Sequence, residues 1–292
     1  MTAVLGVDVG GTSVRAVARL ADGSRTPVVS RPVPRSYPEL LDVLAGLAPP
    51  GPVRSVVVGL PGATGTTVPR WIPALSWLDG RPLAADLAAR LAGTPDVVLR
   101  NDAQVALLGE AREGAALGRT DAVLVSVGTG VGGAIMLGGR IVGGATGTAG
   151  AFGWLPSAGV TATTDHGALE LAASGRALDR LAGPGRAGSD LVADARADDG
   201  TDARAARRAL DDWAAALGRG IAAVASVLDP EIVVLAGGLC EAFDAYAEPL
   251  RAAVRAGASP ATRNVAVVPA RLGGRAGAIG ALCATDPREV WT

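Results

Sequence analysis

The 292-residue sequence contains no lysine, one histidine and two cysteines, and each shortage excludes a class of protein. Without lysine the chain cannot carry a P-loop Gly-Lys-Ser/Thr motif, a protein-kinase strand lysine or a Schiff-base lysine. A structural zinc site takes about four cysteine or histidine ligands, so His166, Cys240 and Cys283 cannot build one within a single chain. The two cysteines lie far apart and do not suggest a disulfide framework.

The chain also lacks a long apolar run, a signal-peptide pattern and an excess of either charge. No apolar stretch is long enough to span a membrane, and the first strand is expected at once, at Val4–Asp8. The net charge of −1 gives no indication of nucleic-acid binding. We therefore expect a cytoplasmic protein with neither a membrane nor a nucleic-acid partner. Its hydrophobic fraction of 49% is ample for one large or two modest domains.

The apolar pattern predicts two halves that repeat one topology, each opening with two strands joined by a glycine-rich turn. The expected strands are Val4–Asp8, Val14–Leu20, Val28–Val33, Arg54–Val58, Val97–Leu99, Ala122–Val127, Val131–Leu137, Arg140–Val142, Glu231–Leu235 and Val265–Val268. The expected helices are Tyr37–Leu47, Pro82–Leu91, one that starts near Ala103, Gly167–Leu181, Ala205–Leu228, Ala242–Val254 and Gly274–Cys283. The remaining expectations are a rigid turn at Gly59–Gly62, a loop at Trp71–Leu83 and a loose connection at Gly183–Asp202. Such a repeat suggests two similar lobes around a cleft.

Glycine turns at Gly10–Gly11, Gly128–Gly130 and Gly237–Gly238 offer backbone N–H groups without obstructing side chains. Two such turns facing each other would suit a polyphosphate held between two lobes. Asp8 ends the first strand, where it could hold Mg²⁺ through water. An ordinary hairpin turn is the alternative explanation of this stretch.

The Asn101-Asp102 pair ends an apolar strand and is followed at once by a helical pattern. Asn or Asp is a natural N-cap at such a junction, and capping alone is the simpler explanation of Asp102 from this stretch. The alternative is a catalytic base, because Asp102 lies on the crossing between two glycine-rich halves.

Six motifs, in this order and spacing, resemble the ROK family of repressors and sugar kinases. They are Asp8–Thr12, Gly59–Gly62, Asn101–Ala103, Glu110–Gly118, Gly128–Gly133 and Leu228–Gly238. The chain begins on its first strand, without the N-terminal helix-turn-helix of the repressor members, and so resembles the kinase branch.

The resemblance implies an α/β protein with the actin-like ATPase (ribonuclease H-like) fold, two similar lobes around a central cleft. The small lobe would comprise residues 1–102 and a C-terminal helix at about 275–292, and the large lobe residues 103–274. It further implies a transferase that uses ATP and Mg²⁺ to phosphorylate a primary sugar hydroxyl, and that is a homodimer, as relatives commonly are.

The resemblance also assigns roles to individual residues. Asp102 would be the general base, and Asp8 would position Mg²⁺ through water. The residues expected at the substrate are Gly59, Pro61, Gly62, Asn101, Asp102, Ala151, Trp154 and Glu170. The residues expected at the nucleotide are Asp8, Gly10, Gly11, Thr12, Gly128, Thr129, Gly130, Gly237 and Gly238.

The chain departs from the family pattern on one side of the sugar. Ala151 and Trp154 stand where the family has a sugar-binding Glu and a His that binds both sugar and zinc. All three cysteines of the next motif are replaced within Thr161–Glu170, so no zinc is expected, although Glu170 itself is kept. His166 is off the ligand register and is expected to be a helix-start or surface residue.

These losses leave three functions open. One is a kinase of altered specificity for a hexose, an amino sugar, an N-acylated sugar or a cyclitol. Another is a degenerate regulatory or scaffold protein, and the last is an ATPase switch. The kinase explains best why Asp102 is kept, because a degenerating protein has no reason to preserve it.

Overall fold

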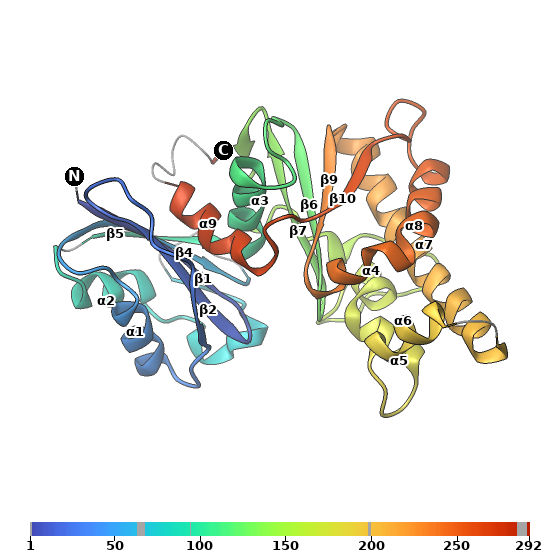
Figure 1. Cartoon of the computed structure of the whole chain (residues 1–292), viewed down its shortest axis with the longest axis horizontal. Helices are drawn as coiled ribbons and strands as arrows, with labels where there is room; N and C mark the ends of the chain where they lie inside the picture. The colour runs from blue at the N-terminus through green and yellow to red at the C-terminus, as the bar shows by residue number, and fades with distance from the viewer. Residues whose placement is uncertain (1, 63–67, 94, 198–199, 285–290) are drawn as a thin grey trace. The chain divides into compact units, whose positions relative to one another are not determined.

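The computed structural model describes residues 2–62, 68–93, 95–197, 200–284 and 291–292 (Figure 1). The chain divides into two compact units. Unit 1 comprises Met1–Thr120, Ala134–Ala149 and Arg271–Thr292, and unit 2 comprises Asp121–Gly133 and Gly150–Ala270. Residues 63–67, directly after the turn expected at Gly59–Gly62, lie outside the described part.

Two five-stranded sheets repeat one strand order, as the sequence predicts. The first runs β3-β2-β1-β4-β5, and the second runs β8-β7-β6-β9-β10. In the first sheet β1–β3 are antiparallel neighbours, while β4 lies parallel to β1 and β5 parallel to β4. In the second sheet β9 is parallel to β6 and to β10. The strands are β1 Ala3–Val9, β2 Ser13–Arg19, β3 Val29–Pro32, β4 Val53–Leu60, β5 Asp96–Asn101, β6 Ala122–Val127, β7 Val131–Leu137, β8 Arg140–Ile141, β9 Ile232–Ala236 and β10 Ala266–Pro269.

Helices cover the first sheet on both faces. Leu40 and Leu44 of α1 and Leu83 and Leu87 of α2 pack on one face of the sheet in a single buried cluster. On the other face, Ala278 and Leu282 of α9 pack on β1 and β2. The helices are α1 Tyr37–Gly46, α2 Leu83–Arg90, α3 Asp102–Glu113, α4 Ala168–Ala173, α5 Gly175–Ala182, α6 Gly188–Arg196, α7 Thr201–Leu228, α8 Phe243–Gly257 and α9 Ala276–Cys283.

The C-terminal helix α9 packs closely on α3, and glycine makes that approach possible. A Cβ on Gly280 would lie 1.7 Å from the carbonyl oxygen of Val105, and one on Gly109 would lie 2.3 Å from that of Ala276. Both helices therefore belong to unit 1. This division differs from the expected lobes, which separate the chain at residue 102.

In unit 2 the long helix α7 carries the apolar stripe that the sequence predicts. Trp213, Leu217 and Ile221 are buried, and Trp213 meets Tyr246 of α8 edge to face at 5.2 Å. No helix in the described ranges combines the length and apolar character that a membrane span requires.

Two expectations in unit 2 are wrong. The segment Gly183–Asp202, expected to be a loose connection, contains α6, whose first turn is held by Asp190 accepting from the backbone N–H of Ala187 at 2.9 Å. The single helix expected at Gly167–Leu181 is broken at Ser174, which is extended and whose hydroxyl accepts from the N–H of Ala177 to cap α5.

Two smaller differences concern the first half of the chain. Strand β4 continues through Leu60, so the turn expected at Gly59–Gly62 starts only at Pro61. The loop expected at Trp71–Leu83 contains a short 3-10 helix at Pro73–Leu78.

Candidate functional site

Residues expected at the substrate and at the nucleotide gather in unit 1 where three parallel strands end. Asp8 of β1 is opposite Gly59 of β4, and Leu60 of β4 is opposite Asn101 of β5. Asp102 follows directly as the first residue of α3. The carboxyl ends of parallel strands are where ligands bind in α/β folds. The strand register therefore brings Asp8, Asn101 and Asp102 to the same edge of one sheet.

Asn101, not Asp102, is the N-cap of α3. Its side-chain oxygen accepts from the backbone N–H groups of Ala103 and Gln104 at 3.0 and 3.2 Å. Its amide nitrogen donates to the carbonyl oxygen of Gly62 at 3.1 Å, which ties the expected sugar-site turn to the helix start. The Asp102 side chain accepts from the N–H of Ala103 at 2.8 Å. The explanation of Asp102 as the helix cap is wrong, because the cap position is already filled.

Burial raises the pKa values of both carboxyl groups at this edge. The pKa of Asp8 rises to about 7, first through desolvation and then through the charge of Asp102, while Arg15 lowers it. Desolvation also raises the pKa of Asp102, against the lowering effect of its bond to the Ala103 N–H. Carboxyl pKa values shifted towards neutrality in this way are typical of groups that exchange protons in catalysis.

Two glycines determine how closely the surroundings approach Asp8. A Cβ on Gly277, in the first turn of α9, would lie 2.5 Å from Cγ of Asp8. A Cβ on Gly59 would lie 2.7 Å from Cγ2 of Val105 and 3.5 Å from Asp8 Oδ1. Gly59 thus has a packing role between β4 and α3, and its contact with a substrate stays a prediction. Gly277 was not expected from the sequence, because its role depends on its contact with the distant Asp8.

The first glycine turn leaves its tip open to solvent. Gly10 donates its N–H to the carbonyl oxygen of Ser13 at 2.9 Å, which closes the turn between β1 and β2. Gly11 and Thr12 are exposed. Their backbone and the Thr12 hydroxyl are accessible to an anion, as the sequence predicts for a phosphate loop.

The other two glycine turns lie together in unit 2, after β6 and β9. Gly237 has a φ of 94°, and a Cβ there would lie 2.2 Å from the carbonyl oxygen of Val127, the residue before Gly128. The carbonyl oxygen of Gly128 accepts from the N–H of Gly175, at the start of α5, at 2.7 Å. Thr129 is exposed between its two glycines. These turns again stand at the carboxyl ends of parallel strands.

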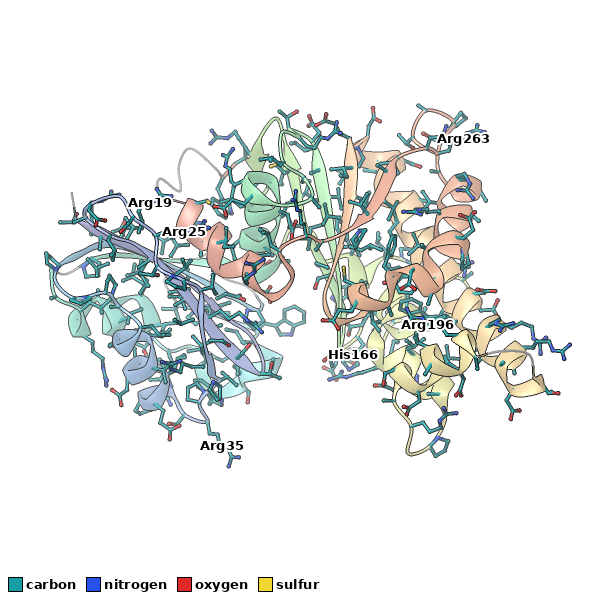
Figure 2. The ribbon with its side chains drawn as sticks, in the orientation of Figure 1. Arg19, Arg25, Arg35, His166, Arg196 and Arg263 are labelled. Atoms are coloured by element: carbon teal, nitrogen blue, oxygen red, sulfur yellow. The ribbon has the colours of Figure 1, made fainter. Side chains whose placement is uncertain are left out.

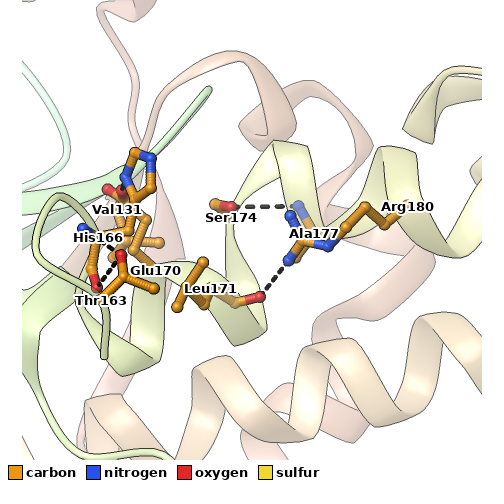
Figure 3. Close-up of polar contacts among 8 residues, drawn as sticks. All are labelled: Val131, Thr163, His166, Glu170, Leu171, Ser174, Ala177 and Arg180. Carbon is orange, nitrogen blue, oxygen red and sulfur yellow. Dashed lines mark hydrogen bonds and ion pairs between the residues drawn. The ribbon is translucent and has the colours of Figure 1, made fainter. Parts of the chain in front are cut away.

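Glu170 lies beside the second of these turns, in contact with His166. Its Oε2 accepts from the backbone N–H of Val131 at 3.0 Å, and its Oε1 lies 2.7 Å from Nδ1 of His166 (Figure 3). His166, marked in Figure 2, directly precedes Gly167, the N-cap of α4, and so lies at a helix start, as expected. Its side chain is 39% exposed, and its contact with Glu170 was not predicted. The i,i+4 spacing of the two residues was the available signal in the sequence.

Ala151 and Trp154 are both exposed, and Phe152 between them is buried. Phe152 packs against Gly133, where a Cβ would lie 2.5 Å from its ring. Across the described ranges, no group of three or more His, Cys, Asp or Glu side chains is arranged to hold a metal ion.

The ROK family model matches residues 4–286. The chain belongs to the ROK family. It is 38% identical over 202 residues to a bifunctional enzyme NanE/NanK from Brucella melitensis, covering 68% of this chain and 36% of that protein. It therefore spans about a third of the length of that relative. It is 32% identical to a glucokinase from Streptomyces coelicolor over 96% of each chain.

Solved structures of family members share the fold. A ROK glucokinase from Streptomyces griseus, in complex with glucose and AMPPNP, is 27% identical, with a TM-score of 0.77 over 96% of this chain and 98% of that one. A ROK hexokinase from Thermus thermophilus is 28% identical, with a TM-score of 0.78 over 96% and 97%. The expected α/β fold of the actin-like ATPase class is confirmed.

Proposed function

We propose that this ROK protein is an ATP-dependent kinase for the primary hydroxyl of a hexose-like sugar, with Asp102 as general base. The observation that carries the proposal is the state of Asp102: it starts α3 at the carboxyl edge of the sheet, yet the capping role belongs to Asn101. Relatives that carry the names glucokinase and N-acetyl-D-glucosamine kinase support the reaction class.

In this mechanism Asp102 accepts the proton of the attacking hydroxyl. A sugar hydroxyl is a weak nucleophile until its proton is leaving, and a carboxylate within hydrogen-bond reach can take that proton as the bond to phosphorus forms. A raised pKa makes Asp102 a stronger base than an exposed aspartate. Asn101 would orient the substrate through the amide N–H that does not bind Gly62.

The nucleotide would be held mainly by backbone groups. The turns Gly10–Thr12, Gly128–Gly130 and Gly237–Gly238 present N–H groups to phosphate, and the hydroxyls of Thr12 and Thr129 add further donors. Asp8 fits a water-mediated Mg²⁺ site, since its desolvated carboxylate lies near a second carboxylate, Asp102, and a cation there would add to the compensating charge of Arg15. A bound Mg²⁺ would neutralise charge on the phosphates during transfer.

The acceptor is a sugar modified on one edge, such as an N-acylated amino sugar. Ala151 and Trp154 cannot donate or accept the side-chain hydrogen bonds that a ring hydroxyl needs at those positions, apart from the Trp indole N–H. Ala151 leaves room, and the exposed indole of Trp154 offers an apolar surface. An unpaired hydroxyl costs on the order of 1–3 kcal/mol, so glucose would bind weakly. The similarity to an N-acetyl-D-glucosamine kinase from Shigella boydii is consistent with an N-acylated amino-sugar acceptor.

A panel of sugars with ATP and Mg²⁺ tests the function, with ADP release and product mass as readouts. We expect sugar-dependent ADP release and a singly phosphorylated product, with a lower KM for an N-acylated hexosamine than for glucose. ADP release without sugar would indicate an ATPase switch, and no release at all a degenerate protein. Efficient turnover of glucose at micromolar KM would contradict the proposed acceptor class alone.

The variant Asp102→Asn tests the general base. We expect kcat to fall by about 10²–10⁴-fold, because Asn keeps the shape but cannot take the proton. Nucleotide affinity should hold and the melting temperature should not fall, since Asn101 still caps α3. Asp96→Asn is the matched control: Asp96 starts the same strand that leads to Asp102, but it is exposed and should leave kcat unchanged. Wild-type turnover in Asp102→Asn would exclude Asp102 as the base.

A further inference from the structure

Both oxygens of the Glu170 carboxylate are engaged within unit 2. Oε2 accepts from the backbone N–H of Val131, and Oε1 accepts from Nδ1 of His166 (Figure 3). A carboxylate offers about four lone-pair sites, so about two remain for other donors. The side chains of His166 and Glu170 are 39% and 22% exposed, which leaves the pair accessible to a ligand.

Two glycines let the backbone approach Glu170 closely. A Cβ on Gly130 would lie 2.2 Å from Glu170 Oε2, and a Cβ on Gly153 would lie 3.2 Å from Glu170 Cβ. Glycine at both positions lets the backbone close around the acid. Through Val131, the carboxylate is joined to the end of the turn Gly128–Gly130.

His166 is itself fixed by a backbone turn. Its N–H donates to the Thr163 hydroxyl at 3.1 Å, and its carbonyl oxygen accepts from the Thr163 N–H at 2.8 Å. The next residue, Gly167, packs against Gly153: a Cβ on Gly167 would lie 2.1 Å from the carbonyl oxygen of Gly153. The imidazole is therefore presented to Glu170 from a closed turn rather than from a freely moving loop.

We propose that His166 is a positioning residue for sugar binding: its Nδ1–H holds Glu170 so that the remaining lone pairs of the carboxylate accept from substrate hydroxyls. This inference rests on the proposed kinase function and deepens it. A carboxylate already fixed on two sides binds hydroxyls with less loss of side-chain freedom. Without His166, Glu170 keeps one anchor, at Val131, and can rotate out of line.

The test compares three substitutions of His166 in the full chain. His166→Ala should raise the KM of the preferred sugar about tenfold, the effect of losing one charge-assisted hydrogen bond. The KM of ATP should stay unchanged. His166→Asn places an amide near the position of Nδ1 and should restore the sugar KM. His166→Gln, whose amide extends towards the position of Nε2, should not. The Asn and Gln pair preserves the comparison where the Ala variant fails to fold.

Two further variants separate positioning from general stability. Arg180 of α5 donates to the carbonyl oxygen of Leu171, which lies next to Glu170 in α4 (Figure 3). Arg180→Ala removes this bond and leaves both anchors of Glu170 in place, so the sugar KM should stay unchanged. In a Glu170→Gln background, His166→Ala should have no further effect on the sugar KM, because His166 acts through Glu170.

The outcomes distinguish this inference from the function beneath it. A wild-type protein without sugar-dependent ADP release overturns both. An active wild type whose sugar KM is the same in His166→Ala, or rises equally in Arg180→Ala, overturns the role of His166 and leaves the kinase standing. An additive effect of His166→Ala in the Glu170→Gln background also overturns it.

Discussion

The carboxyl group of Asp8 has its pKa raised from an ordinary value of 3.8 to about 7, chiefly because it is buried and secondly because Asp102 lies nearby. A buried carboxylate is costly when charged, and Gly277 packs so closely that the group has no room to turn away. At a pH between these two values, Asp8 has lost its proton in the unfolded chain but still holds it in the folded chain. The contribution of Asp8 to stability is therefore complete below about pH 4 and is lost as the pH rises through 7.

The variant Asp8→Asn should remove this dependence. At pH 8 we expect it to stabilise the unliganded protein by about 2–4 kcal/mol, because the charged form is no longer buried. At pH 4 its stability should match the wild type. Denaturant unfolding at the two pH values measures the difference, with the exposed Asp96→Asn as control. Equal stability of Asp8→Asn and wild type at pH 8 would show that the burial of Asp8 is not costly.

Which site residues the sequence reveals depends on how far apart the interacting residues lie. Asn101 and Asp102 were visible because a strand ends and a helix starts within a few residues. The role of Gly277 depends on Asp8, almost the whole chain away, and no local pattern contains it. His166 lies directly before the N-cap of α4, as expected, but its contact with Glu170 four residues later was not predicted, because His166 was compared only with zinc-ligand positions.

At the scale of elements, one buried acid joins α3 to the start of the C-terminal segment. Glu110 is fully buried and accepts from three backbone N–H groups, those of Ala115, Arg271 and Leu272, at 2.6–3.1 Å. The turn after α3 and the segment before α9 thus share one carboxylate. Gly114 is needed beside it, since a Cβ there would lie 2.0 Å from Glu110 Oε2.

The variant Glu110→Gln should lower the free energy of unfolding by about 2–4 kcal/mol, because an NH₂ group would face backbone donors in a buried place. Glu113→Gln on the same helix is the matched control. Its side chain is 34% exposed and pairs with Arg25, and such pairs contribute under about 1 kcal/mol. Thermal or urea unfolding of both variants gives the comparison; equal losses would mean that the buried carboxylate has no special role.

The elements themselves were predicted well where periodicity is strong and poorly where composition misleads. The ten expected strands all exist, since their apolar runs are bounded by turn residues. Helix α6 was missed because its Gly, Ser, Asp and Arg residues are typical of a loop. It buries two large apolar side chains, Leu191 and Val192, which is too few to produce a clear helical pattern. The break at Ser174 was missed because serine also occurs within helices, and its capping bond from the Ala177 N–H is visible only in the structure.

At the scale of the whole molecule, the repeat of one sheet topology follows from the sequence. Each half opens with two strands around a glycine turn and returns through parallel strands, which gives the same strand order twice. The sequence does not show what stabilises the stretch between β8 and α7. In the structure, Phe152 packs on Gly133. The N–H of Leu169 donates to the carbonyl oxygen of Leu155 at 3.0 Å, and Nε1 of Trp213 donates to the carbonyl oxygen of Ser174 at 3.1 Å.

These contacts make the folded state independent of zinc, which we state as a prediction. Purified protein should contain zinc well below one atom per chain, and its melting temperature should be unchanged by EDTA or by a zinc-selective chelator. Packing should carry the stability instead, so Phe152→Ala should cost about 3–5 kcal/mol, as for other buried aromatic side chains. Trp154→Ala, two residues away but 44% exposed, should cost much less. Stoichiometric zinc whose removal lowers the melting temperature would contradict the prediction, because a metal that binds only the folded state must contribute its binding free energy to stability.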